Sequence, residues 1–159
     1  MQLLVEHQKV DFIITNPGSY AQLEAEHGVS RLATIRKKFN GSDNSIYGAV
    51  IFTRSDSQIE TIKDLVNKRF IAVHNNAFGG WWMAKREIAH SGISENELSS
   101  LKFIGFPQDQ VVKAVLNGEA DAGTVRTGII EQLIAEKKLA PDKIKIINAQ
   151  KNTLLSFQA

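Results

Sequence analysis

The sequence predicts an α/β fold built around a largely parallel sheet, in which short strands alternate with helices. Two observations carry this prediction. Apolar runs rich in β-branched and aromatic residues are separated by longer stretches in which apolar residues recur with helical spacing. Residues that punctuate helices fall between them: Pro107 stands at an expected helix start, and Gly92 and Gly118 follow expected helix ends.

The expected elements can be placed in chain order. The apolar runs predict strands at residues 10–15, 31–37, 46–54, 69–74, 102–106, 120–125 and 143–148. The helical pattern predicts helices at residues 18–26, 61–67, 80–91, 108–117 and 127–138. The segment GSDNS at residues 41–45 is rich in turn formers and joins two strand-like segments with no helix between them, so antiparallel strands are expected there.

An internal similarity relates two parts of the chain. Residues 10–26, VDFIITNPGSYAQLEAE, align without a gap on residues 120–136, ADAGTVRTGIIEQLIAE, with identities at Asp11/Asp121, Gln22/Gln132, Leu23/Leu133, Ala25/Ala135 and Glu26/Glu136. The similarity predicts two alike lobes and a chain that starts within a helix; the alternative is that any strand–turn–helix unit resembles another.

The composition limits the classes of function. With 159 residues, of which 43% are hydrophobic and 23% charged, the chain can bury a core, and no apolar run approaches the roughly 20 residues of a membrane helix. The net charge of +2 comes from 19 basic and 17 acidic residues that are well mixed, so no nucleic-acid partner is expected. The absence of cysteine excludes disulfides, thiolate metal sites and cysteine nucleophiles.

A glycine-containing segment between an expected strand and an expected helix is a candidate anion site. In HNNAFGGWWMAKREI, residues 74–88, the backbone N–H groups of Gly79, Gly80 and Trp81 stand at a helix start, where free donors suit an anion. Trp81 and Trp82 point to different faces, so one is expected in the core and the other beside a cleft. The alternative is a flexible loop with two packing aromatics.

Two turns in matching positions form the second candidate. TNPGSY at residues 15–20 and TVRTG at residues 124–128 both follow expected strands, and ligands of open α/β sheets bind at the carboxyl ends of strands. Arg126 could hold an oxyanion through its forked donors, and neutral hydrogen bonds could come from Thr15, Asn16, Tyr20 and Thr127. The alternative is an ordinary Asn-Pro-Gly turn and a solvated arginine.

No catalytic or metal-binding constellation stands out. The histidines His7, His27, His74 and His90 lack metal-ligand spacing, and no serine lies in a G-x-S-x-G motif. We therefore expect no catalytic residue, no metal and no cofactor in this region, and we expect binding rather than catalysis.

The order of several short motifs resembles a known family. YGAVIFTRSDSQIETIKDLVNKRFIAVHNNAFGGWWMAKREIAHSGI at residues 47–93 and VVKAVLNGEADAGTVRTGIIEQL at residues 111–133 resemble the phosphonate-binding type of periplasmic substrate-binding protein. The version used as the extracytoplasmic sensor region of membrane histidine kinases is the most similar in pattern. The resemblance extends over most of residues 10–148.

The resemblance implies a two-lobed type II periplasmic-binding-protein fold with mixed, mainly parallel sheets flanked by helices and a ligand in the cleft between the lobes. Residues 1–53 would be a truncated lobe one with the first hinge strand. Residues 54–148 would be lobe two, and residues 149–159 the second hinge and return toward lobe one.

The resemblance also implies where the ligand would bind. The family's anion-binding loop falls on Ala77, Phe78, Gly79, Gly80 and Trp81, its lobe-one contact on the turn at residues 16–20, and a second lobe-two contact on Arg126 and Thr127. Transporter members carry hydroxyl-rich residues at 77–79 and an acidic residue at 126. An aminophosphonate is therefore not expected, whereas a sulfur or phosphorus oxyanion or a small carboxylate is.

Four functions follow, in order of preference. The first is a periplasmic sensor domain, part of a membrane-anchored protein, that binds a small anionic solute and signals to a histidine kinase in the same polypeptide. The second is a solute-binding protein that delivers a phosphonate-like or other oxyanion to an ABC permease. The effector domain of a transcription regulator and an enzyme on the same scaffold follow well behind.

Overall fold

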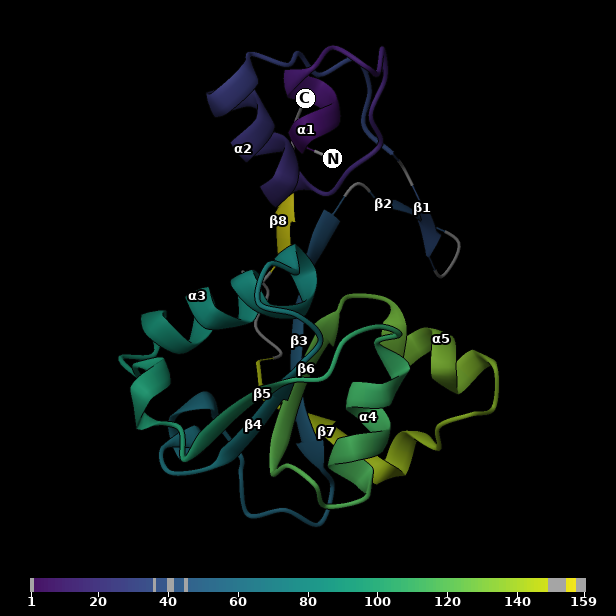
Figure 1. Cartoon of the computed structure of the whole chain (residues 1–159). Coiled ribbons are helices and arrows are strands. Elements are labelled where there is room, and N and C mark those ends of the chain that lie inside the picture. Colours follow the sequence, from purple (N-terminus) through teal and green to yellow (C-terminus); the bar gives the residue numbers. More distant parts are fainter. Residues whose placement is uncertain (1, 36, 40–41, 45, 149–153, 157–159) are drawn as a thin grey trace.

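The computed structural model describes residues 2–35, 37–39, 42–44, 46–148 and 154–156 (Figure 1). Its strands are β1 (Lys37–Phe39), β2 (Ser42–Asn44), β3 (Ile46–Arg54), β4 (Arg69–Ala72), β5 (Ser100–Phe103), β6 (Ala122–Arg126), β7 (Ile144–Ile146) and β8 (Leu154–Ser156). Its α-helices are α1 (Gln2–Glu6), α2 (Pro17–His27), α3 (Met83–His90), α4 (Asp109–Leu116) and α5 (Ile129–Ala135). Shorter helical turns are η1 (Ile62–Leu65), η2 (Phe78–Trp82), η3 (Glu95–Glu97) and η4 (Pro141–Lys143).

The main sheet is mixed and has the strand order β5-β4-β6-β3-β7, with β8 also paired to β3. Strand β4 runs parallel to β5 and β6, whereas β3 is antiparallel to β6, β7 and β8. The α/β class is confirmed. Antiparallel strands are present around residues 41–45, as expected, in the separate pair of β1 and β2, in which Phe39 is opposite Ser42. The expected role of this segment as a turn between residues 31–37 and 46–54 is wrong, because Ser42–Asn44 form β2.

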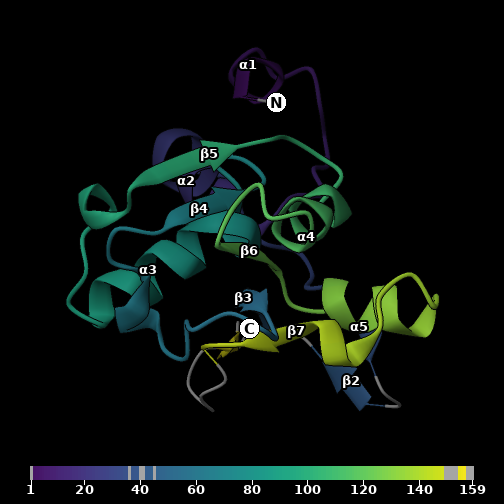
Figure 2. The same cartoon turned by 90° about the horizontal axis from the view of Figure 1, so that it is seen from below.

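Helices cover both faces of this sheet, with α3 on one side and α4 and α5 on the other (Figure 2). Alternate residues of each central strand therefore enter opposite cores: Phe70 of β4 packs toward the α3 side, whereas Ile71 packs toward α4. A strand buried on both faces needs a nearly continuous apolar sequence. This requirement explains why VIF at residues 50–52 and FIAV at residues 70–73 carry no polar residue.

Two expected strands are wrong. Residues 10–15 form no strand, and among the described residues of the expected strand at 31–37 only Lys37 lies in one. Most apolar side chains of these segments are exposed, among them Phe12 at 78% and Ile14 at 83%, whereas Ile13 is partly exposed. A strand is stable only when a neighbour takes up its backbone hydrogen bonds, and residues 10–15 and 31–35 pair with no strand in the described part of the chain.

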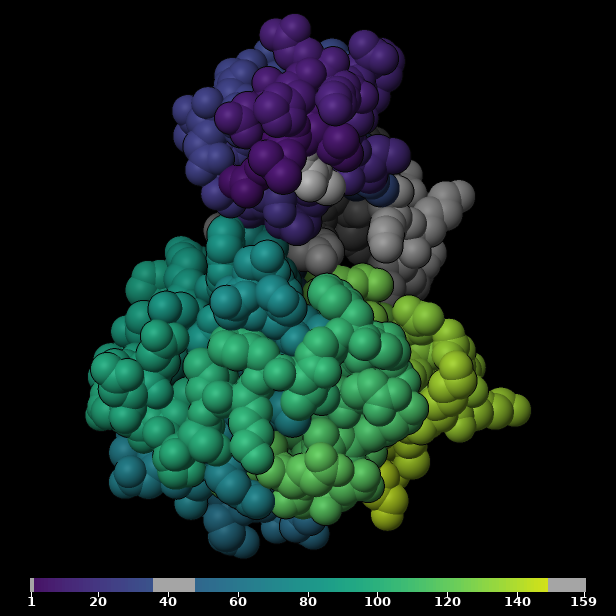
Figure 3. All heavy atoms as spheres, viewed as in Figure 1, coloured from purple at the N-terminus to yellow at the C-terminus, as the bar shows by residue number. Residues whose placement is uncertain are grey.

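The residues before β3 form a separate group at one end of the sheet. Helices α1 and α2 lie there, joined to the main α/β body through β3, with β8 alongside (Figure 1). In the space-filling view the N-terminal residues rest on the end of the body that carries η2 (Figure 3). We call residues 2–35 the N-terminal part and residues 48–148 the α/β body.

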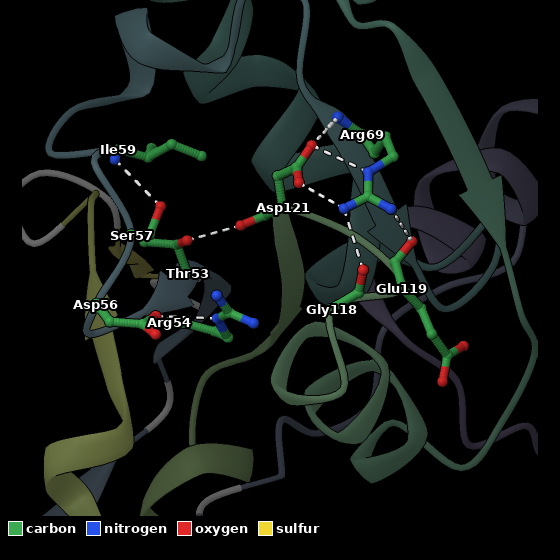
Figure 4. A network of polar contacts seen from close by, with 9 residues as sticks. All are labelled: Thr53, Arg54, Asp56, Ser57, Ile59, Arg69, Gly118, Glu119 and Asp121. Atoms are coloured by element: carbon green, nitrogen blue, oxygen red, sulfur yellow. Dashed lines mark hydrogen bonds and ion pairs between the residues drawn. The ribbon is translucent and has the colours of Figure 1, made fainter.

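A polar network fixes the opposite end of the body (Figure 4). The Asp121 carboxylate, just before β6, accepts hydrogen bonds from the backbone N–H of Arg69 at 2.8 Å and from its guanidinium at 2.7 Å and 3.2 Å. These bonds from Arg69 lower the pKa of Asp121 below its ordinary value. The network locks the start of β6 to the start of β4, so the far ends of both strands are set in register.

Candidate functional site

The carboxyl ends of two adjacent parallel strands define the candidate site. Strand β4 leads through residues 73–77 into η2, and β6 ends at Arg126. Phe70 is opposite Ala122 and Ile71 is opposite Gly123, so both strands end at the same edge of the sheet. That edge is where open α/β sheets bind ligands, and it faces the N-terminal part.

The turn η2 supplies two free backbone donors. Its wide helical turn is closed by hydrogen bonds from the N–H groups of Trp81 and Trp82 to the carbonyl oxygen of Ala77, at 2.8 and 3.1 Å. The N–H groups of Gly79 and Gly80 have no acceptor among the described residues, although both residues are buried. A buried N–H group needs an acceptor, so these two donors suit a bound anion. The expectation that the Trp81 N–H is also free is wrong, because it donates to Ala77.

Gly80 is required for this geometry. A Cβ atom at this position would lie 2.5 Å from Cγ1 of Val73 and 3.3 Å from the Cβ of Ala77. Only a residue without a side chain lets the turn approach the end of β4 so closely.

The two tryptophans divide as expected between core and surface. Trp81 is 3% exposed and packs against Phe70 and Phe103, with ring centroids 6.1 and 5.5 Å apart. Trp82 is 39% exposed, and its indole N–H donates to the carbonyl oxygen of Asn75 at 2.7 Å. The Trp81 side chain therefore belongs to the core, and Trp82 borders the candidate site.

Arg126 and Thr127 stand at the end of β6. One guanidinium nitrogen of Arg126 donates to the carbonyl oxygen of Thr127 at 3.2 Å, and the partly exposed side chain has no carboxylate partner within the described ranges. Thr127 holds the end of β6 against β3: its N–H donates to the Gly48 carbonyl at 3.0 Å, and its hydroxyl accepts from the Gly48 N–H at 3.3 Å. The guanidinium retains donors for an anion, and the threonine hydroxyl retains its proton.

Gln108 is a site residue that the sequence reasoning missed. Its side-chain oxygen accepts from the backbone N–H of Arg126 at 2.7 Å and lies 3.5 Å from where a Cβ of Gly80 would stand. Because that oxygen faces an N–H donor, the side-chain NH₂ is fixed on the other side, where it has no acceptor in the described structure. At 8% exposure Gln108 is nearly buried, and the only signal in the sequence was a polar residue at the start of the expected helix 108–117, directly after Pro107.

The N-terminal part supplies the turn at residues 16–20, and its side chains are already occupied. The Asn16 side-chain oxygen accepts from the Ser19 N–H at 3.0 Å and so caps α2. The Tyr20 hydroxyl donates to Glu24 at 2.5 Å, a bond that raises the pKa of Tyr20. Thr15 is partly exposed. The structure brings this turn to η2 through Gly18, yet it directs the Asn16 and Tyr20 side chains into α2 itself.

Other polar groups do not extend the site. His74 accepts a hydrogen bond from the Asn76 N–H at 3.3 Å on its own loop. Within the described residues there is no group of three or more His, Cys, Asp or Glu side chains that could hold a metal ion. A cavity of about 620 Å³ lies between α3 and η3, lined among others by Lys85, Ser94 and Glu95. None of the described helices is long and apolar enough to cross a membrane.

The fold and the site define a solute-binding domain of the α/β class, with donors of positive or neutral character gathered at the edge of the sheet. The family model for the phosphonate periplasmic substrate-binding proteins of ABC transporters matches residues 1–152. The chain belongs to this family, whose members are binding proteins for small ligands rather than enzymes.

One curated relative is a signalling protein. The tetrathionate sensor histidine kinase TtrS of Salmonella typhimurium (strain LT2) is 32% identical over 137 residues, which are 86% of this chain and 23% of the kinase. The chain therefore spans about a quarter of the length of that relative.

Solved structures show the same fold. XAC2383 of Xanthomonas citri, bound to ATP, matches with a TM-score of 0.71 at 17% identity, over 92% of this chain and 56% of the other. PhnD1 of Prochlorococcus marinus (MIT 9301), in complex with methylphosphonate, matches with a TM-score of 0.51 at 18% identity, over 64% of this chain and 40% of the other. The type II periplasmic-binding-protein fold is thus confirmed, and the chain covers part of it.

Proposed function

We propose that this chain is the extracytoplasmic sensor domain of a membrane histidine kinase and that it binds a sulfur oxyanion, with tetrathionate as the first candidate. One observation carries the proposal: donors with spare capacity gather at one edge of the sheet. The N–H groups of Gly79 and Gly80 and the NH₂ of Gln108 have no acceptor among the described residues, and the guanidinium of Arg126, which donates once to the Thr127 carbonyl, has no carboxylate partner there. Donors without acceptors at one place select a ligand that is rich in acceptors and carries negative charge.

The chemistry of tetrathionate matches these donors. The ion is an elongated dianion with a sulfonate group at each end, and each sulfonate accepts several hydrogen bonds while it cannot donate any. The backbone N–H groups of η2 suit one sulfonate, and Arg126 with Thr127 suits the other. The arginine at position 126 disfavours the amine of an aminophosphonate through like-charge repulsion.

The relationship to a tetrathionate sensor kinase supports the sensor over the importer. The second candidate is the solute-binding component of an ABC importer for a phosphonate-like or other oxyanion, which the family description supports. Both functions use the same site. They differ in the partner: the kinase regions of the same polypeptide for a sensor, or an ABC permease for an importer.

The proposed mechanism is a shift in population between open and closed arrangements of two lobes. Residues 1–53 contribute to lobe one and the first hinge strand, residues 54–148 form lobe two, and residues 149–159 return toward lobe one. An anion held by Gly79, Gly80, Gln108 and Arg126 accepts hydrogen bonds from these donors on lobe two and balances the charge of Arg126. The turn at residues 16–20 covers it from the other side. The ligand thereby favours the closed form, and the closed form changes the activity of the attached kinase.

A ligand screen tests the proposal. The full protein is titrated with tetrathionate, thiosulfate, sulfate, methylphosphonate and 2-aminoethylphosphonate, and thermal unfolding is recorded. A ligand at about 100 times its dissociation constant stabilises the native state by about 2.7 kcal/mol. We expect a shift with tetrathionate and none with 2-aminoethylphosphonate. A folded protein that no oxyanion stabilises would overturn the proposal.

Two variants of Gln108 separate ligand binding from structural support. Gln108→Glu keeps the oxygen that accepts from the Arg126 N–H and replaces the free donor by an acceptor, whereas Gln108→Met removes both. A hydrogen bond to a charged partner corresponds to about 1.5–3 kcal/mol, so both variants should bind tetrathionate about tenfold to a hundredfold more weakly. If Gln108 only supports Arg126, the loss for Gln108→Glu should come from repulsion by the new carboxylate alone and should shrink at high salt, whereas the loss for Gln108→Met should not.

Signalling distinguishes sensor from importer. In membranes that contain the full protein, tetrathionate should change the rate of autophosphorylation if the chain belongs to a kinase. Tetrathionate-stimulated ATP hydrolysis by a reconstituted permease, with no effect on a kinase, would favour the importer instead.

A further inference from the structure

The contact between the N-terminal part and the α/β body depends on a residue without a side chain. Gly18, in the first turn of α2, is buried against the aromatic rings of η2. A Cβ at this position would lie 2.6 Å from Cζ3 and 2.9 Å from Cε3 of Trp82, and 3.0 Å from Cδ2 of Phe78. These separations are shorter than van der Waals contact between carbon atoms, so the contact forms only because residue 18 is glycine.

The surface that receives Gly18 is held in place. The Trp82 ring is tied by its indole N–H to the carbonyl oxygen of Asn75, at 2.7 Å, on the loop between β4 and η2. Its backbone N–H is tied to Ala77 at 3.1 Å. Turning the ring away from an added methyl group would break the indole hydrogen bond, while the backbone at residue 82 is held in the turn.

The other side of the contact is equally well defined. Helix α2 begins at Pro17, is capped by Asn16, and runs for 11 residues. Gly18 has an ordinary helical backbone with no positive φ, so glycine is not needed there for backbone conformation. In a helix, alanine is more favourable than glycine by about 1 kcal/mol. The fit to Trp82 is thus the feature of the structure that accounts for a glycine in the first turn of α2.

We propose that Gly18 and Trp82 form a closure latch: the bare backbone of α2 seats on the Trp82 ring when the two parts come together around the ligand. The inference rests on the proposed function and goes beyond it, because it assigns the closing contact to two residues that are not among the donors proposed to hold the ligand. Gly18 and Trp82 are positioning residues. They set how far the turn at residues 16–20 can approach the free donors of η2.

A double-mutant cycle tests the latch. The full protein is prepared as wild type, Gly18→Ala, Trp82→Leu and the double variant, and its affinity for tetrathionate is measured by calorimetry. Overpacking a tight contact commonly reduces the stability of the packed form enough for about a tenfold loss of affinity. We expect that loss for Gly18→Ala in the wild-type background and little loss in the Trp82→Leu background, where the smaller side chain leaves room for the methyl group.

Controls keep the outcomes separate. Gln22→Ala changes an exposed position of the same helix and should leave the affinity unchanged. The unfolding midpoints of wild type and Gly18→Ala are measured with and without ligand. A fall for Gly18→Ala that is as large without ligand as with it would mean that the contact with Trp82 is the same in the open and closed forms, and would overturn the latch. Equal affinities of wild type and Gly18→Ala, or an equal loss in both backgrounds, would overturn the latch while leaving the proposed function intact. Failure of the wild type to bind any oxyanion would overturn the proposed function itself.

Discussion

Two segments of similar sequence adopt different structures in this chain. Residues 120–136 form β6, a turn and α5, with Val125 fully buried. Residues 10–26 form only the turn and the helix, and Ile14 is 83% exposed. The difference lies in the neighbours: β6 has β3 and β4 on either side, whereas residues 10–15 have no strand beside them in the described structure. A sequence with strand propensity therefore forms a strand only where a neighbouring strand pairs with its backbone.

The turns of the two segments differ in a second way. Asn16 uses its side chain to cap the following helix, whereas Arg126, at the matching position, has no carboxylate partner among the described residues. The first turn therefore supplies shape, through Gly18, and the second supplies charge. We expect the α/β body to provide most of the binding energy for an anion.

The largest expected effect tests this division of roles. Arg126→Ala should weaken tetrathionate binding by about 2–5 kcal/mol, because it removes the one charged donor assigned to the ligand. Asn16→Ala, the matched variant, should lower the unfolding free energy by about 1 kcal/mol through loss of the helix cap and change the affinity little. Calorimetry and urea unfolding measure the two quantities. Equal losses of affinity would show that both turns bind the ligand alike.

The next effect concerns the two strand-like segments. Val125→Ala should lower the unfolding free energy by about 2 kcal/mol, since it leaves a cavity among fully buried side chains. Ile14→Ala removes more side-chain atoms from an exposed position and should change stability by less than about 0.5 kcal/mol. Urea unfolding of both variants gives the comparison. A cost for Ile14→Ala as large as that for Val125→Ala would mean that residues 10–15 are packed in solution.

The smallest effect separates the two matching aspartates. Asp121 is held by Arg69 (Figure 4), and replacing it with asparagine should cost about 1 kcal/mol at neutral pH, because the pair is partly exposed to solvent. Asp11 is exposed and has no hydrogen bond or ion pair within the described residues, so Asp11→Asn should cost nothing measurable.

The dependence on pH follows from the lowered pKa of Asp121. A carboxyl whose pKa is lower in the folded state stabilises the protein above its unfolded pKa of about 3.9, and this contribution is lost as the pH falls through the folded pKa. The gap in unfolding free energy between wild type and Asp121→Asn should therefore narrow below about pH 4. A gap that stays constant down to pH 2 would exclude the charged pair as its cause.

Much of the fold follows from the sequence because the buried strands are apolar throughout and the helices have clear ends. The strands at residues 46–54 and 120–125 and the helices at residues 108–117 and 127–138 are expected within a few residues of where they lie. The expectation fails at residues 10–15, where apolar residues predict a strand but pairing decides it. The expected second hinge at 149–159 falls mostly outside the described residues; β8 within it pairs with β3.

The site is harder to predict because a sequence does not show which donors and acceptors are already paired within the folded protein. Trp81 and Gly80 have similar backbone chemistry, yet only the N–H of Gly80 is free. In the sequence Gln108 is an ordinary residue at a helix start. Only the structure shows that its side-chain oxygen accepts a hydrogen bond from the backbone N–H of Arg126. Position at the sheet edge was predictable from topology, whereas the direction of each donor was not.

The most direct test of the central claim is to follow the backbone and side-chain amide signals of the full protein by NMR while tetrathionate is added. The account predicts that the largest changes occur at the backbone N–H groups of Gly79 and Gly80 and at the side-chain NH₂ of Gln108. Changes confined to the cavity between α3 and η3, with Ser94 and Lys85 most affected and Gly79, Gly80 and Gln108 unmoved, would contradict it.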